Sequence, residues 1–131
     1  MLHEGITSGI IHAFYTVYNG LGYGFLEKVY ENALAHELGK NGLQVCSQMP
    51  IHVYYDGLCV GEYFSDLCVE GLVIVEIKTA DVIAEQHKAQ LVNYLKATEI
   101  EVGLLLNFGP QPKFVRKLYT NDRKIICKGS S

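Results

Sequence analysis

The chain has 131 residues, 49% of them hydrophobic, and its 14 acidic and 11 basic side chains give a formal net charge of −3 at pH 7. These values predict a single domain with its own core over residues 1–131, and they exclude a mainly disordered chain. No apolar run reaches the roughly 18 residues that span a bilayer, so we expect no membrane partner. The acidic balance argues against binding nucleic acid by bulk charge alone, but it is compatible with a compact acidic site that holds a metal ion.

The first third of the chain has the pattern of two helices. Apolar residues between Ile6 and Tyr18 recur at spacings of three and four, which is typical of a helix with one buried face. Three glycines within residues 20–24 disfavour a continuous helix. Apolar spacing then predicts a second helix over about residues 25–38, which ends at Asn41-Gly42.

The pattern then changes to that of strands. β-Branched and aromatic residues over 43–55 and 58–69, on either side of Asp56-Gly57, predict an antiparallel hairpin. The nearly continuous apolar run over 72–78 predicts a central strand that is covered on both faces.

A third helix is predicted over about residues 83–97 and a further buried strand over 102–108. The order α-α-β-β-β-α-β predicts an α/β domain in which helices flank a mixed central sheet. From about residue 113 the chain continues as a basic tail, which is either a nucleic-acid contact patch or a solvated terminal strand or helix whose lysines protect a sheet edge. The basic residues from this point on are Lys113, Arg116, Lys117, Arg123, Lys124 and Lys128.

The four cysteines, Cys46, Cys59, Cys68 and Cys127, contain no CxxC pair and no zinc-ribbon spacing. Three of them lie in apolar, strand-like stretches, so we expect buried, reduced, structural thiols. A cytoplasmic location follows as the expectation, because a secreted domain of this kind would pair its cysteines.

Charged side chains interrupt two predicted strands where apolar ones would cost less. Asp66 lies in the second strand of the hairpin, and Glu76 and Lys78 lie in the central strand. Residues two apart on a strand point to the same face, so Glu76 and Lys78 emerge together. They are either an ion pair at a solvent-facing strand end or, if Asp66 faces the same way, part of a site with two carboxylates and an amine. The second arrangement suits metal-assisted hydrolysis of phosphodiesters.

The connection between the two strands decides whether such a site can form. A regular two-residue loop of Glu70-Gly71 would place Asp66 opposite Val75, on the other face from Glu76. A connection of odd length, such as residues 70–72, or a β-bulge would set Asp66 opposite Glu76. The metal-site hypothesis therefore predicts an odd loop or a bulge.

Asp66, nine intervening residues and then Glu76-Ile77-Lys78 resemble the D…(E/D)-x-K core of the PD-(D/E)XK nuclease superfamily. Residues 24–30, Gly-Phe-Leu-Glu-Lys-Val-Tyr, match the signature of the small bacterial GxxExxY proteins, a group within that superfamily. The resemblance covers roughly residues 5–119. It implies a restriction-endonuclease-like core, an α+β sandwich around a mixed sheet.

The resemblance also implies a role for each residue of this core. Asp66 and Glu76 match the ligands of Mg²⁺ or Mn²⁺, and the Ile77 backbone carbonyl matches a third ligand. Lys78 matches the catalytic lysine. The implied activity is a divalent-metal-dependent nuclease acting on DNA or RNA. The alternatives are a catalytically weak or inactive nucleic-acid-binding or accessory protein of the same fold, and a homodimeric interaction module.

Three further residues match outside the core, and Tyr94 lies one helical turn after one of them, Gln90, on the same face. Glu27 matches an additional acidic position that holds metal or positions water, with an ordinary acid in the first turn of a helix as the alternative. Gln90 matches a glutamine near the scissile phosphate. Tyr30 and Tyr94 are candidate substrate-binding residues, with buried structural roles as the alternative. The chain departs from the family pattern at Phe64, where arginine is common, so a phosphate contact there is not implied.

Overall fold

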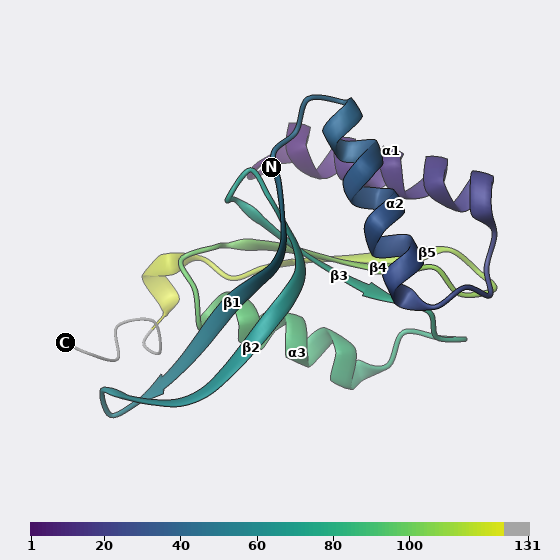
Figure 1. Cartoon of the computed structure of the whole chain (residues 1–131). Helices are drawn as coiled ribbons and strands as arrows, with labels where there is room; N and C mark the ends of the chain where they lie inside the picture. Colours follow the sequence, from purple (N-terminus) through teal and green to yellow (C-terminus); the bar gives the residue numbers. More distant parts are fainter. Residues whose placement is uncertain (125–131) are drawn as a thin grey trace.

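The computed structural model describes residues 1–124, which form one sheet with helices on both faces (Figure 1). Helices α1 (Glu4–Leu21) and α2 (Glu27–Lys40) cover one face, and α3 (Glu85–Lys96) covers the other. Between α1 and α2 the chain turns at Gly22 and Gly24, whose φ angles of 69° and 112° favour glycine. In the described part of the chain, no helix is both long and apolar enough to cross a lipid bilayer.

The sheet has five strands in the order β1-β2-β3-β4-β5. All neighbouring strands are antiparallel except β3 and β4, which are parallel because α3 connects them. The predicted α+β sandwich with a mixed central sheet is therefore confirmed, in the predicted order. The strands are β1 (Val45–Tyr55), β2 (Leu58–Val69), β3 (Val73–Lys78), β4 (Val102–Asn107) and β5 (Lys113–Leu118).

The fifth strand replaces the first part of the predicted basic tail. Residues of β5 pair antiparallel with β4 over its whole length, and a short 3-10 helix, Asn121–Arg123, follows. Residues 113–118 thus form a terminal edge strand of the sheet, and a nucleic-acid contact by the basic residues after 113 stays a prediction. Lys128 and Cys127 lie outside the described residues.

Side chains alternate along β3 between two hydrophobic cores. Val73, Val75 and Ile77 face the core that α1 and α2 cover, and Ile74 faces the core that α3 covers. Because residues two apart share a face, Glu76 and Lys78 point to the same side as Ile74, toward α3. The alternation therefore decides which helix is near the charged residues of β3.

The expectation of buried cysteines is correct for one residue and wrong for two. Cys68 is buried in β2, whereas Cys46 and Cys59 are exposed, and all three are free thiols. Cys46 lies on β1, the edge strand, and Cys59 lies near the tip of the β1–β2 hairpin, where no helix covers the strands. Strand propensity alone does not distinguish such positions from central ones.

We predict that Gly103→Ala destabilises the fold because Leu91 of α3 packs directly against this glycine of β4. An added Cβ would lie 2.7 Å from Leu91 Cδ1, and Leu91 is fully buried. Overpacking of this kind costs about 1–3 kcal/mol of unfolding free energy, which urea denaturation measures. Gly39→Ala in α2 is the matched control, since no atom lies within 4 Å of its added Cβ, and it should be neutral or slightly stabilising. Equal stability of the two variants would contradict the close packing.

Candidate active site

The turn between β2 and β3 has the odd length that a joint acidic site requires. Strand β2 ends at Val69 and β3 begins at Val73, so residues 70–72 form the connection. The pairs Leu67–Val75 and Val69–Val73 continue to a position where Asp66 lies opposite Glu76. Opposed residues of antiparallel strands share a face, so both carboxylates point toward the α3 side.

Strands β2 and β3 separate at Asp66 and Glu76. The ladder pairs end at Leu67–Val75, and beyond them each carboxylate accepts a backbone hydrogen bond from the other strand. The Asp66 N–H donates to Glu76 Oε2 at 2.8 Å, and the Ile77 N–H donates to Asp66 Oδ2 at 2.7 Å. The two side chains thus provide the acceptors that a regular ladder would take from strand carbonyls, so the Asp66 and Ile77 N–H groups are both paired. Both carboxylates are held at the point of separation.

Strand β1 is also irregular beside Asp66. The pairs Ser47–Leu67 and Met49–Ser65 put Gln48 opposite Asp66, and Gln48 has a φ of 56°. A left-handed conformation at a non-glycine residue costs on the order of 1–3 kcal/mol and is common at functional sites. The Gln48 amide donates to the two carboxylate oxygens of Glu31 at 3.2 and 3.3 Å.

Glu31 is a third acid near the pair, and the sequence patterns did not single it out. It is 4% exposed on α2, and Lys28 Nζ donates to it at 2.8 Å. Its charge contributes to the raised pKa of Asp66. The available signal was an acid directly after Tyr30 in the apolar stretch of this helix, four residues after Glu27 and so on the same face.

Burial and mutual repulsion disfavour the charged forms of the two opposed carboxyl groups. Burial and the Asp66 charge raise the pKa of Glu76 from 4.5 to about 8, against the opposing effects of the Asp66 N–H and of Lys78. Burial is also the main cause of the raised pKa of Asp66, and the Ile77 N–H opposes it. A cation between the two oxygens would stabilise both carboxylates, so the donor pair fits a hard divalent metal such as Mg²⁺.

Lys78 lies at the end of β3, on the same face as Glu76. In residues 1–124 no carboxylate oxygen comes within 4.0 Å of its ammonium group, so the strand-end ion pair is not formed there. Its charge still acts on the site, because it lowers the pKa values of both Asp66 and Glu76. Lys78 is thus close to the pair without being neutralised by it.

Hydrogen bonds from the end of β4 fix the backbone after Lys78, and we call this arrangement the Asn107 clamp. The buried Asn107 side chain accepts from the Ala80 N–H and donates to the Ala80 carbonyl, both at 2.9 Å. The Phe108 N–H donates to the Lys78 carbonyl at 2.8 Å, and a Cβ on Gly109 would collide with the Ala80 carbonyl oxygen. The sequence patterns did not assign Asn107 a role, although an amide that ends a buried apolar strand was the available signal.

Glu27 lies apart from the opposed carboxylates. It is the first residue of α2 and is exposed, although its charge raises the pKa values of Asp66 and Glu76. Within residues 1–124, no three His, Cys, Asp or Glu side chains approach one another closely enough to hold a metal ion. The structure therefore brings together Asp66, Glu76 and Lys78, with Glu27 acting at longer range.

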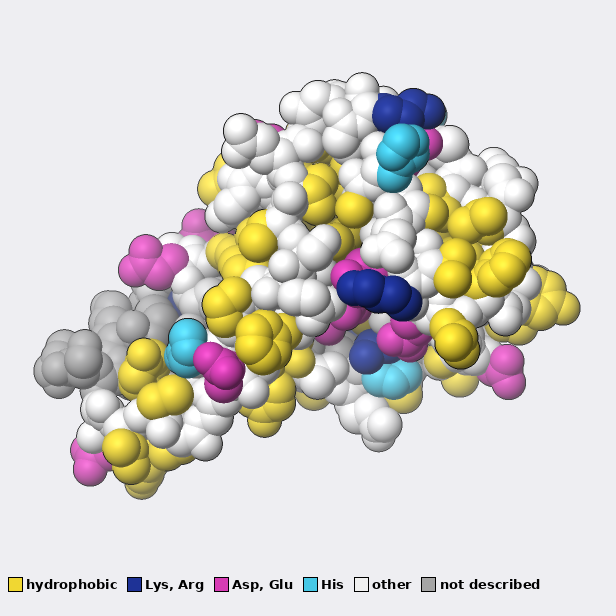
Figure 2. Space-filling view, viewed as in Figure 1, with side chains coloured by type: hydrophobic (Ala, Val, Ile, Leu, Met, Phe, Trp, Pro, Cys, Tyr) yellow, Lys and Arg dark blue, Asp and Glu magenta, His cyan; other side chains and the backbone are white. Residues whose placement is uncertain are grey.

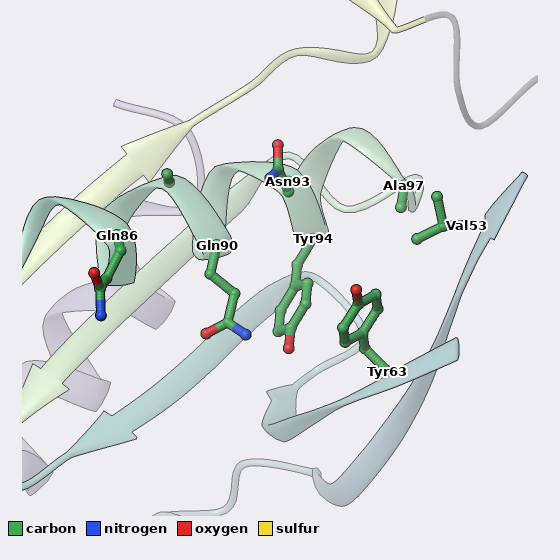
Figure 3. A pocket seen from close by; sticks show the side chains of 8 residues that line it. Val53, Tyr63, Gln86, Gln90, Asn93, Tyr94 and Ala97 are labelled. Carbon is green, nitrogen blue, oxygen red and sulfur yellow. The ribbon is translucent and has the colours of Figure 1, made fainter. Parts of the chain in front are cut away.

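Gln90 and Tyr94 line a pocket between α3 and the β1–β2 hairpin (Figure 3). Burial, followed by the charges of Glu76 and Asp66, raises the pKa of Tyr94 to about 12. Tyr94 packs in the same core cluster as Ile74, and Glu76 lies two residues further along β3 on the same face, so the ring lies on the side of the acidic pair. Tyr30, in contrast, is fully buried. Its hydroxyl donates to the Gly22 carbonyl at 2.6 Å, which fits the structural alternative and leaves no surface for a substrate.

One face of the molecule brings acidic and basic side chains together between two groups of exposed hydrophobic side chains (Figure 2). One group covers the hairpin tip and the other covers the α1–α2 connection. The hydrophobic residues are Tyr54, Tyr55, Leu58 and Val60 at the tip, and Tyr23, Phe25, Leu26 and Val29 at the connection.

The comparisons with known proteins agree with this geometry. The family model of the PD-(D/E)XK nuclease superfamily matches residues 4–118, so the chain belongs to this superfamily. Two solved structures are similar: the protein SSO0001, with a TM-score of 0.55 and 19% identity, and an alkaline exonuclease from Laribacter hongkongensis, with a TM-score of 0.51 and 11% identity. The first alignment covers 71% of this chain and 50% of SSO0001, and the second covers 93% and 73%.

This chain therefore spans half the length of SSO0001. At these identities the likeness shows the fold, which is restriction-endonuclease-like. No curated protein matches the chain significantly. Membership of the GxxExxY group stays a prediction from the residues 24–30.

We predict that the metal-free protein loses stability as the pH rises from about 4.5 to about 8, the range in which Glu76 is protonated in the folded chain but ionised in the unfolded chain. The folded pKa is about 8 and the ordinary value is 4.5, so between them the folded chain binds more protons than the unfolded chain. The unfolding free energy then falls with rising pH, by on the order of a few kcal/mol. Urea denaturation in EDTA across this range measures it. Glu76→Gln keeps an acceptor but does not titrate, so its profile should be flatter; equal slopes would contradict the assignment.

Proposed function

We propose that this protein is a divalent-metal-dependent nuclease that hydrolyses phosphodiester bonds in DNA or RNA. The observation that carries the proposal is the odd-length turn, which sets Asp66 opposite Glu76 where β2 and β3 separate, with Lys78 two residues further on the same face. Membership of the PD-(D/E)XK nuclease superfamily supports it, as does the likeness in fold to an alkaline exonuclease.

In this proposal Asp66, Glu76 and the Ile77 carbonyl hold Mg²⁺ or Mn²⁺. The bound metal would supply an acidified water and would neutralise charge on the phosphate oxygens. Asp66 and Glu76 are already fixed by backbone hydrogen bonds, so little reorganisation accompanies binding. Glu27, which is exposed and lies outside the carboxylate pair, positions a water rather than contacting the ion.

Lys78 would orient the attacking water and stabilise charge that develops on the phosphate. Its ammonium group has no ion-pair partner within residues 1–124, so it is available for this role. The Asn107 clamp fixes the backbone on which Lys78 stands. Gln90 projects from α3 on the same side of the sheet and would donate its amide N–H to a phosphate oxygen.

We predict that Lys78→Ala lowers the cleavage rate by at least about 100-fold, because it removes the fixed positive charge at the reacting phosphate. Cleavage of labelled single- and double-stranded DNA and RNA with Mn²⁺ measures the effect. The matched control is Lys40→Ala, which removes an exposed lysine at the far end of α2.

Equal cutting by Lys78→Ala and Lys40→Ala would contradict the catalytic role. If the wild type cuts none of these substrates, the alternative gains support, namely a nucleic-acid-binding or accessory protein that has kept the fold.

We also predict that Mn²⁺ raises the thermal stability of the wild type near pH 8, because a ligand that binds only the folded chain shifts the folding equilibrium. Glu76→Gln and Asp66→Asn should lose most of this rise, since each removes one of two anionic ligands. Circular dichroism melts with Mn²⁺ and with EDTA provide the measurement. A rise that is undiminished in both variants would place the ion elsewhere.

A further inference from the structure

The pocket between α3 and the β1–β2 hairpin, which we call the Tyr63–Tyr94 pocket, has a lining suited to a flat ligand. Its volume is about 450 Å³, which lies within the usual range for small-ligand sites. Tyr63 from β2 faces Tyr94 from α3, and Gln86 and Gln90 extend from the same side of the helix as Tyr94 (Figure 3). The lining residues are Val53, Tyr63, Gln86, Ala89, Gln90, Asn93, Tyr94 and Ala97.

The two tyrosine rings are splayed rather than stacked. Their centroids are 5.7 Å apart and their planes make an angle of 44°. Tyr63 is 48% exposed, so one large aromatic surface faces solvent at the mouth of the pocket. An exposed ring beside a cavity offers a stacking surface to a planar group.

The polar groups of the pocket are all neutral. No Asp, Glu, Lys or Arg is among the lining residues. Within residues 1–124, the side-chain amides of Gln86 and Gln90, which point to the pocket side of α3, have no hydrogen-bond partner, so their donors and acceptors are available to a ligand. A neutral lining with aromatic rings and free amides favours an uncharged planar ring with hydrogen-bonding edges over a phosphate.

The pocket adjoins both the acidic pair and a cationic surface. Tyr94 packs against the face of β3 that carries Ile74, and Glu76 follows on the same face, so the pocket borders the acidic pair. The charges of Glu76 and Asp66 accordingly raise the pKa of the Tyr94 hydroxyl. Across α3, Lys88, Lys96 and Lys117 line a second hollow, which shares Ala89 and Asn93 with the first. Glu85 also lines it and pairs with Lys88 at 3.1 Å, so Lys96 and Lys117 carry its net positive charge. A nucleic-acid strand lying across α3 would contact aromatic and amide groups on one side of the helix and ammonium groups on the other.

We propose that the Tyr63–Tyr94 pocket binds one unstacked base of a single-stranded nucleic acid and so holds the adjoining phosphodiester at the Asp66–Glu76 pair. The inference rests on the proposed nuclease function and adds the substrate class. A paired duplex presents its bases edge-on within the stack, so it cannot fill this pocket unless a base leaves the helix. DNA and RNA share the planar bases that the pocket recognises, so binding is measured separately with a DNA strand and with an RNA strand.

Binding is measured without cleavage, by fluorescence anisotropy of the Lys78→Ala protein in EDTA. The probes are labelled single strands of about 12 nucleotides, of DNA and of RNA, a matched strand with abasic positions, and the DNA duplex. We expect the base-containing DNA strand, the RNA strand or both to bind more tightly than the abasic strand and the duplex.

Tyr63→Ala, made in the same background, should weaken single-strand binding by about 10-fold, and Tyr63→Phe should retain most of the affinity because it keeps the ring. Tyr55→Ala is the control: it removes a ring that is 75% exposed on the same hairpin and does not line the pocket. Binding of the abasic strand should not respond to Tyr63→Ala.

Three results would overturn the proposal: no binding of any strand, equal binding of base-containing and abasic strands, or equal effects of Tyr63→Ala and Tyr55→Ala. These outcomes differ from failure of the nuclease function. If wild-type protein cuts with Mn²⁺ while Tyr63→Ala binds single strands normally, the nuclease function is supported and base binding in the pocket is refuted. If binding depends on the bases but wild-type protein cuts no substrate, base binding in the pocket is supported and the nuclease function is refuted.

Discussion

The candidate site depends on two hydrogen bonds from backbone N–H groups to the opposed carboxylates, one from Asp66 to Glu76 and one from Ile77 to Asp66. Two carboxylates can stay opposed in a half-buried site only if each has a donor, and the Asp66 and Ile77 N–H groups are those donors. These donors are available because β2 leaves β3 at this point. The same separation carries the rest of the hairpin toward α3, where Tyr63 meets Tyr94. The acidic pair and the neighbouring pocket therefore have one structural origin.

Burying two opposed carboxylates lowers the free energy of unfolding, but it places negative charge where a metal ion would bind. The pKa of Glu76 is raised to about 8, and Gln48 adopts a left-handed conformation beside Asp66. The surrounding structure compensates with strong packing, since β3 and β4 are almost entirely buried between two cores. The net charge of −3 is then compatible with a phosphodiester substrate, because part of the acidity lies where a divalent cation would bind.

Much of the fold followed from local patterns, and the misses have a common cause. Helical spacing and the Asp56-Gly57 turn located the main elements, and the three-residue connection that the metal-site hypothesis required is the one observed. Cys46 and Cys59 were expected to be buried, but both are exposed, Cys46 on the edge strand β1 and Cys59 near the tip of the β1–β2 hairpin. The roles of Glu31 and Gln48 depend on a contact between α2 and β1. Exposure and contacts of this kind depend on distant parts of the chain, which periodicity does not describe.

Local sequence patterns were enough to predict the elements, their order and the spacing of Asp66, Glu76 and Lys78, because backbone sterics, side-chain periodicity and turn residues act over a few residues. The sequence also carried the superfamily signature that the comparison over residues 4–118 supports. Three arrangements became visible only in the folded chain: each carboxylate accepts a hydrogen bond from the other's strand, Glu27 lies apart from the pair, and Tyr63 and Gln90 line one pocket. Those arrangements arise where strand register, strand separation and helix packing meet, and each of these depends on contacts between segments far apart in the chain.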